Sequence, residues 1–170
     1  MSPDLIFVTL ASLLAGAIDA IVGGGGLVLV PALFSAFPTA APATLLGTNK
    51  GAAVWGTAWA TAQFSRRVTL RWTALLPAAG MALVGSALGA WSVIRVDGSG
   101  LRRVLPFVLA AVLVYTLMRK DLGRAHRPRW QEAREVWVAS AIGLVIGGYD
   151  GFFGPGTGSF LVFLFVRLLG

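Results

Sequence analysis

Residues 16–26 read GAIDAIVGGGG and residues 147–158 read GGYDGFFGPGTG, and each stretch lies deep inside an apolar segment. At an offset of 131 residues, Gly16, Asp19, Gly23 and Gly25 coincide with Gly147, Asp150, Gly154 and Gly156. Helices that break at matching positions of two halves form the substrate pocket of many secondary transporters. Carboxylates at membrane depth are costly and tend to be functional. The two stretches therefore predict a transport site.

The composition is that of an integral membrane protein. Of the 170 residues, 56% are hydrophobic and 12% are charged, and the mean hydropathy is +0.79. Soluble domains have about 45–50% apolar and about 25% charged residues, so no separate soluble domain is expected. The formal net charge is +7. Because the basic residues lie between apolar segments, this charge does not indicate nucleic-acid binding.

The first apolar segment, residues 5–37, is too long for one straight span of about 20 residues. We expect a helix to about residue 22, a break at Gly23–Gly26 and a second half-helix. If this segment enters and leaves by the same face, the N-terminus changes sides. Further apolar segments cover residues 43–64, 72–94, 104–118 and 136–169, the last of them broken at Gly154–Gly158.

These segments predict an all-α polytopic bundle with two homologous repeats, each opening with a glycine-broken helix. Residues 1–118 would form the first repeat, with about four segments, and residues 136–170 the opening of the second. We expect the rest of the second repeat to lie beyond residue 170 or to come from another copy. Residues 119–135 form a basic loop, which the positive-inside rule places in the cytoplasm together with residues 66–71.

Asp19 and Asp150 each lie 14 residues from the start of their segments. At about 1.5 Å per residue they lie roughly 21 Å along the helix, past the middle of a hydrocarbon core of about 30 Å. Two roles are open for these carboxylates. They serve proton coupling or substrate binding, or they accept backbone N–H bonds in the glycine breaks as structural caps.

Lys50 lies in the segment Gly47-Thr48-Asn49-Lys50-Gly51, about seven residues into the second apolar segment. A hydroxyl, an amide and an ammonium group suit an oxyanion, and half-helix N-termini add backbone N–H groups that favour anions. Alternatively, Lys50 is the counter-ion of Asp19, or it reaches the membrane interface along its flexible stem. The candidate substrate-binding residues are Thr48, Asn49, Lys50, Gly24, Gly25, Gly156 and Thr157.

Other chemistries find no support in the sequence. No G-x-x-x-x-G-K-[ST] or G-x-G-x-x-G motif is present, and no His, Asp and Glu cluster has metal-ligand spacing. There is no cysteine, and the single histidine, His126, lies in a charged loop. We therefore expect no enzyme activity, cofactor or metal centre. Close helix packing is expected at three G-x-x-x-G pairs, namely Gly47/Gly51, Gly85/Gly89 and Gly143/Gly147.

The two glycine stretches, with Pro31 and the GTNK of residues 47–50, resemble the TauE/SafE family of sulfite and organosulfonate exporters. The stretch YDGFFGPGTGSF of residues 149–160 is similar to a branch of that family found in bacterial inner membranes. The resemblance spans the whole chain. It implies an all-helical permease of seven or eight spans, built by duplication, that carries small sulfur-containing or carboxylate anions. This chain does not contain a segment of the second repeat that would correspond to Asn49 and Lys50.

The predicted function is therefore a multi-pass permease that moves sulfite, an organosulfonate or a similar small anion across the bacterial inner membrane. Asp19 and Asp150 would couple transport to protons. The expected partners are the lipid bilayer, the anion and further copies of the chain in a homo-oligomer. The alternative is a membrane scaffold or assembly subunit that transports nothing, in which Lys50 pairs with Asp19.

Overall fold

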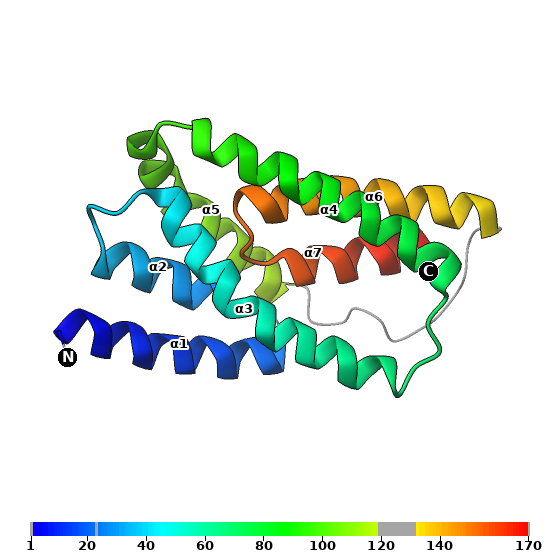
Figure 1. Cartoon of the computed structure of the whole chain (residues 1–170), viewed down its shortest axis with the longest axis horizontal. Helices are drawn as coiled ribbons and strands as arrows, with labels where there is room; N and C mark the ends of the chain where they lie inside the picture. The colour runs from blue at the N-terminus through cyan, green and yellow to red at the C-terminus, as the bar shows by residue number, and fades with distance from the viewer. Residues whose placement is uncertain (1, 23, 119–131, 170) are drawn as a thin grey trace.

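The computed structural model describes residues 2–22, 24–118 and 132–169, and within these ranges it is helical and contains no strand (Figure 1). The helices are α1 (Pro3–Val22), α2 (Gly26–Ala36), α3 (Pro42–Ser65), α4 (Trp72–Arg95), α5 (Gly98–Met118), α6 (Glu132–Phe152) and α7 (Thr157–Leu164), and a π-helical turn, η1 (Phe165–Leu169), continues α7. The expected all-α fold is confirmed. Whether the two broken helix pairs are homologous repeats stays a prediction.

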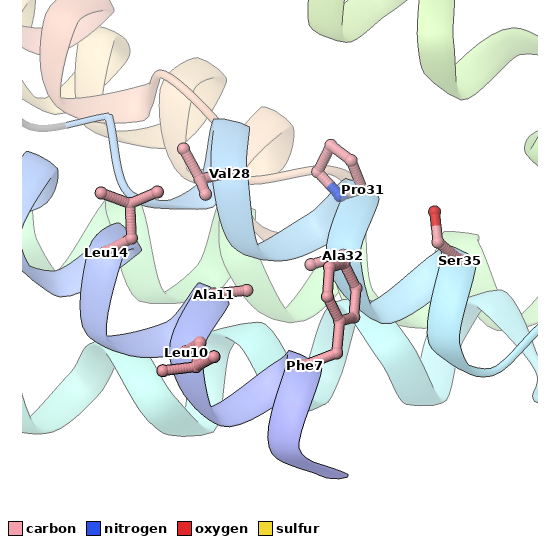
Figure 2. A pocket seen from close by; sticks show the side chains of 8 residues that line it. All are labelled: Phe7, Leu10, Ala11, Leu14, Val28, Pro31, Ala32 and Ser35. Carbon is pink, nitrogen blue, oxygen red and sulfur yellow. The ribbon is translucent and has the colours of Figure 1, made fainter. Parts of the chain in front are cut away.

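The first apolar segment breaks within the predicted stretch Gly23–Gly26, although α2 already begins at Gly26 and Gly23 lies outside the described residues; α2 turns back along α1 (Figure 1). The start of α1 and the end of α2 therefore lie at the same end of this hairpin. Figure 2 shows the two helices facing each other across an apolar pocket of about 450 Å³. The pocket is lined by Phe7, Leu10, Ala11 and Leu14 from α1 and by Val28, Pro31, Ala32 and Ser35 from α2.

The second break also lies in the predicted stretch, but it covers residues 153–156 and not 154–158, because α7 already begins at Thr157. Gly154 and Gly156 adopt the left-handed conformation, with φ of +89° and +80°. Glycine adopts this conformation without the steric cost that a Cβ brings. Two such residues within three positions stop α6 and redirect the chain into α7.

Helices α4 and α6 run parallel in backbone contact. A Cβ on Gly85 or Gly89 would strike the carbonyl oxygens of α6, and a Cβ on Gly143, Gly147 or Gly151 would strike those of α4. The packing expected for Gly85/Gly89 and Gly143/Gly147 is therefore confirmed. Around Gly47 and Gly51 of α3 nothing lies within 4 Å of an added Cβ, so in the described chain this pair is not at a helix contact.

Parallel α4 and α6 begin at the same end of the molecule, as Figure 1 shows. Arg71, at the start of α4, forms an ion pair of 2.9 Å with Glu135 in the first turn of α6. The starts of α4 and α6 thus lie together, and the side of the membrane on which the two basic connections lie stays a prediction. Most of the predicted loop, residues 119–131, lies outside the described residues, and residues 132–135 belong to α6 and not to the loop.

Among the described helices, three are long and apolar enough to cross a membrane, namely α1, α4 and α5. Their outward side chains are exposed, as lipid-facing residues are; Leu13, Leu83 and Phe107 are examples. The main apolar core forms where α2, α3, α4 and α5 surround the second break, and Phe153 of that break is part of it. Helix α5 begins at Gly98, six residues earlier than expected, because Asp97 caps its first turn by accepting the N–H of Gly100.

Candidate functional site

The two helix breaks meet inside the bundle. A Cβ placed on Gly26, the first residue of α2, would lie 3.4 Å from Cα of Pro155 in the second break. The same Cβ would lie 3.5 Å from the side-chain amide of Asn49 on α3. Figure 1 shows why they meet, since α1 and α6 approach the middle of the molecule from opposite ends. Asn49 and Lys50 are neighbours on α3, so this turn of α3 lies beside both breaks.

Asp19 lies in the last turn of α1, and its carboxylate crosses the first break. Its Oδ1 accepts a hydrogen bond of 2.9 Å from the backbone N–H of Gly25, directly before α2. The C-terminal end of a helix carries partial negative charge, which disfavours a carboxylate there, whereas the N-terminal end of the next helix favours it. Asp19 therefore caps the start of α2, as the structural alternative predicted, and this contact does not exclude a further role.

Asp150 occupies the matching place in the last turn of α6 but has different partners. Its Oδ1 forms an ion pair with Nζ of Lys50 and accepts a hydrogen bond of 2.7 Å from the hydroxyl of Thr157, the first residue of α7. The side chains of Lys50 and Asp150 are 35% and 32% exposed. The alternative in which Lys50 is the counter-ion of Asp19 is therefore wrong, because Lys50 is paired with Asp150.

Glycine at position 154 leaves the space that the Lys50 ammonium group occupies. A Cβ on Gly154 would lie 2.5 Å from Nζ of Lys50. The hydroxyl of Thr157 lies 2.6 Å from the Gly154 carbonyl oxygen as well as 2.7 Å from Asp150, so its single proton serves one acceptor at a time. Tyr149 donates a hydrogen bond of 2.7 Å to the Pro155 carbonyl and braces the same turn.

Each carboxylate lines its own cavity. A small one of about 100 Å³ lies between α1, α2 and α3, and its polar lining residues are Ser12, Asp19 and Asn49. A larger one of about 410 Å³ lies between α4, α6 and α7, and its polar lining residues are Ser86, Asp150 and Thr157. The amide side of α3 thus faces one cavity, while the lysine is bound to the carboxylate of the other.

The structure brings most of the predicted site residues to the two breaks. Thr48 is apart from them, because its hydroxyl donates to the Thr44 carbonyl at 2.9 Å and its side chain is exposed. Gly25 offers its N–H to Asp19, and the left-handed Gly156 packs against Val112. The binding and coupling roles of all these residues stay predictions.

Sequence analysis missed Ser12, Ser86 and Tyr149. Ser12 lies seven residues before Asp19, and residues seven apart share one face of a helix, so this spacing is a usable pattern. Tyr149 precedes Asp150 directly and gives no comparable pattern. Among the described residues no group of three or more His, Asp or Glu could hold a metal ion.

Comparison with known proteins gives one consistent result. The model of the family described as "Sulfite exporter TauE/SafE" matches residues 8–170. The chain is 39% identical over 169 residues to a probable membrane transporter protein, ORF9, of Sinorhizobium sp., and 39% identical over 171 residues to the probable membrane transporter protein YfcA of Escherichia coli K12. These matches cover 98% and 100% of this chain and 62% of each relative.

A probable membrane transporter protein of Haemophilus influenzae is 39% identical over 161 residues, 92% of this chain and 60% of its own length. The chain thus spans about three fifths of the curated relatives it matches. No solved structure matches the chain. The family description and the relatives' names are those of membrane transporters.

Proposed function

Because the chain belongs to the sulfite exporter TauE/SafE family of membrane transporters, we propose that it carries a small oxyanion across the bacterial inner membrane. The anion is sulfite, an organosulfonate or a compound of similar charge and size. The substrate site lies where the two breaks meet, and the polypeptide crosses the membrane several times. The length and hydropathy of the helices support this proposal, since three described helices are long and apolar enough to span a bilayer.

The ion pair of Lys50 with Asp150 is the observation that carries the proposal. Lys50 is the only ionisable residue of α3, and it is directed to the point where α7 begins. An ammonium group beside a helix N-terminus is an arrangement that attracts anions. Gly156 and Thr157 supply the backbone and hydroxyl donors of that N-terminus, while Gly24, Gly25 and Asn49 supply those near α2. Thr48 would need to change its hydrogen bond to take part.

Coupling to protons would arise because the oxyanion and the Asp150 carboxylate compete for the ammonium group of Lys50. An oxyanion that binds Lys50 takes the place of the Asp150 carboxylate, and two negative charges on one ammonium group are unfavourable. Protonation of Asp150 removes one of these charges and leaves Lys50 free for the anion. Asp19 is the second carboxylate at the breaks, and its protonation would remove a charge that no lysine offsets. The anion and the proton would therefore bind together.

Flux measurements test the proposal. Proteoliposomes that contain the protein should take up radiolabelled sulfite when a proton gradient is imposed. Lys50→Gln should abolish flux, since it removes the fixed positive charge, and Arg66→Gln is the matched control because that side chain is exposed at the end of α3. Asp19→Asn should leave sulfite binding measurable and make flux insensitive to the pH gradient.

A loss of flux in Lys50→Gln has to be separated from a loss of folding. The double variant Lys50→Gln/Asp150→Asn removes both charges together and keeps side chains of similar size. If this variant folds but does not bind sulfite, Lys50 is a binding residue. If it folds and transports sulfite as well as the unmodified protein, the ion pair is only structural and the proposed substrate site is wrong.

A further inference from the structure

Asp19 is a carboxylate without a basic partner among the described residues. The ionisable side chains of α1 are Asp4 and Asp19, α2 has none, and α3 has only Lys50, which is paired with Asp150. Within the described part of the chain, the single polar contact of the Asp19 carboxylate is with the Gly25 N–H. An ionised carboxylate at membrane depth is costly unless another charge offsets it. The cavity beside Asp19 is therefore a place for a cation.

The lining of this cavity supplies further oxygen atoms. Asn49 is only 6% exposed, and its side-chain amide makes no hydrogen bond within the described part of the chain. Polar groups inside proteins are generally hydrogen-bonded, so this amide is available to a ligand in the cavity that Asn49 lines. The Ser12 hydroxyl lines the same cavity. The backbone carbonyl of Ala15 lies close by, 2.7 Å from where a Cβ on Gly25 would be.

The direction of the helix dipole also favours a cation on this side of the break. Asp19 is three residues before the end of α1, and the last carbonyl groups of a helix carry partial negative charge. In transporters built from broken helices, half-helix C-termini and unwound carbonyl groups coordinate the coupling cation, whereas N-termini face the anion. Hard cations take carboxylate, carbonyl and hydroxyl oxygens as ligands.

We infer that the cavity between α1, α2 and α3 binds a sodium ion, held by the carboxylate of Asp19, the side-chain carbonyl of Asn49 and the hydroxyl of Ser12. A monovalent ion fits because one carboxylate offsets one positive charge. The cavity of about 100 Å³ accommodates an alkali ion with little water, since one water occupies about 30 Å³ in the liquid. Sodium would compete with the proton proposed for Asp19, and the role of this competition in coupling rests on the proposed function, but the binding of sodium does not.

Equilibrium binding of ²²Na⁺ to the purified protein in choline-based buffer tests the inference. We expect saturable binding of ²²Na⁺. Unlabelled sodium should displace the bound ion, whereas choline should not. Asp19→Asn should abolish it, because the substitution removes the charge and keeps the shape of the side chain. Asp4→Asn is the matched control, since it removes a carboxylate from the first turn of the same helix, far from the cavity. Ser12→Ala should weaken binding without loss of helix, as alanine favours helices.

The outcomes separate this inference from the proposed function. No saturable sodium binding, or equal binding by Asp19→Asn and the unmodified protein, would overturn the sodium site and leave anion transport standing. If Asp19→Asn fails to fold, unchanged sodium affinity in Ser12→Ala and in Asn49→Ala together would overturn it. Sodium binding without any sulfite flux would instead sustain the site while the proposed permease function fails.

Discussion

The hairpins α1/α2 and α6/α7 place an aspartate and a glycine break at matching positions, yet the two breaks differ chemically. At the first, Asp19 accepts one backbone N–H and has no basic partner among the described residues. At the second, Asp150 binds both Lys50 and Thr157, and two left-handed glycines shape the turn. The matching pattern sets where the chain breaks, whereas a single lysine on α3 decides which break carries a balanced charge.

The second hairpin is also the more firmly held. Helix α6 is in backbone contact with α4 through Gly143, Gly147 and Gly151, and Phe153 and Pro155 of its break are buried. The outer face of α1 is exposed along most of its length, and α1 packs chiefly on α2. We therefore expect substitutions at matching positions to cost more in the second hairpin than in the first.

Gly147→Ala against Gly16→Ala is the strongest test of this difference. A Cβ on Gly147 would strike the Ala82 carbonyl oxygen and lie 2.8 Å from Ala82 Cα, whereas nothing lies within 4 Å of a Cβ on Gly16. Gly147→Ala should lower the free energy of unfolding by about 3 kcal/mol, the upper range for overpacking. Gly16→Ala should be neutral or stabilise by up to about 1 kcal/mol. Thermal unfolding in detergent measures both, and equal effects would contradict the comparison.

Removal of Lys50 should have the next largest effect. Lys50→Met leaves the partly buried Asp150 with Thr157 alone, which should lower the free energy of unfolding by about 1–3 kcal/mol, as for other unsatisfied polar groups. Adding Asp150→Asn should recover much of this loss. Adding Asp19→Asn to Lys50→Met should recover none of it, since Asp19 is not the partner. Rescue by Asp19→Asn instead would reverse the assignment of the ion pair.

Gly154→Ala probes the shape of the second break. A left-handed φ costs a residue with a Cβ roughly 1–2 kcal/mol, and here the Cβ would also lie 2.5 Å from Nζ of Lys50. We expect the double variant Gly154→Ala/Lys50→Ala to lose less stability than the sum of the two single variants, because without the ammonium group and Cε of Lys50, which would lie 2.6 Å from this Cβ, the backbone strain is the main cost left. Strict additivity, measured by a double-mutant cycle, would show that the lysine does not occupy this space.

The smallest effect is expected at Asp97, an exposed carboxylate that caps α5 outside the breaks. The hydroxyl of Ser99 and then the N–H of Gly100 lower its pKa below the usual 3.8. Because the folded pKa is the lower one, this cap stabilises the protein above about pH 3.8 and the contribution is lost as the pH falls through the folded value. The melting temperature of Asp97→Asn should therefore be slightly below that of the unmodified protein at pH 6, and this difference should shrink as the pH falls below 3.8.

Sequence analysis predicted the breaks and the apolar segments because glycine, proline and hydropathy act locally. It offered Asp19 as a possible counter-ion of Lys50 and did not consider Asp150, because the actual partner depends on the opposite directions of α1 and α6, which no local pattern records. It also expected packing at Gly47 and Gly51 from spacing alone. Spacing places two glycines on one face of a helix, but only the fold decides whether another helix lies against that face, as α4 does against Gly143 and Gly147.

The contact of Gly26 with Pro155 has a thermodynamic consequence. The start of α2 and the second break share this contact, so a ligand that shifts one of them changes the free energy of the other. Linkage between two binding equilibria is reciprocal. An oxyanion at Lys50 that tightens cation binding at Asp19 by some factor must itself bind tighter by the same factor when the cation is present. One calorimetric titration of each ligand, with and without the other, would measure the same coupling free energy twice.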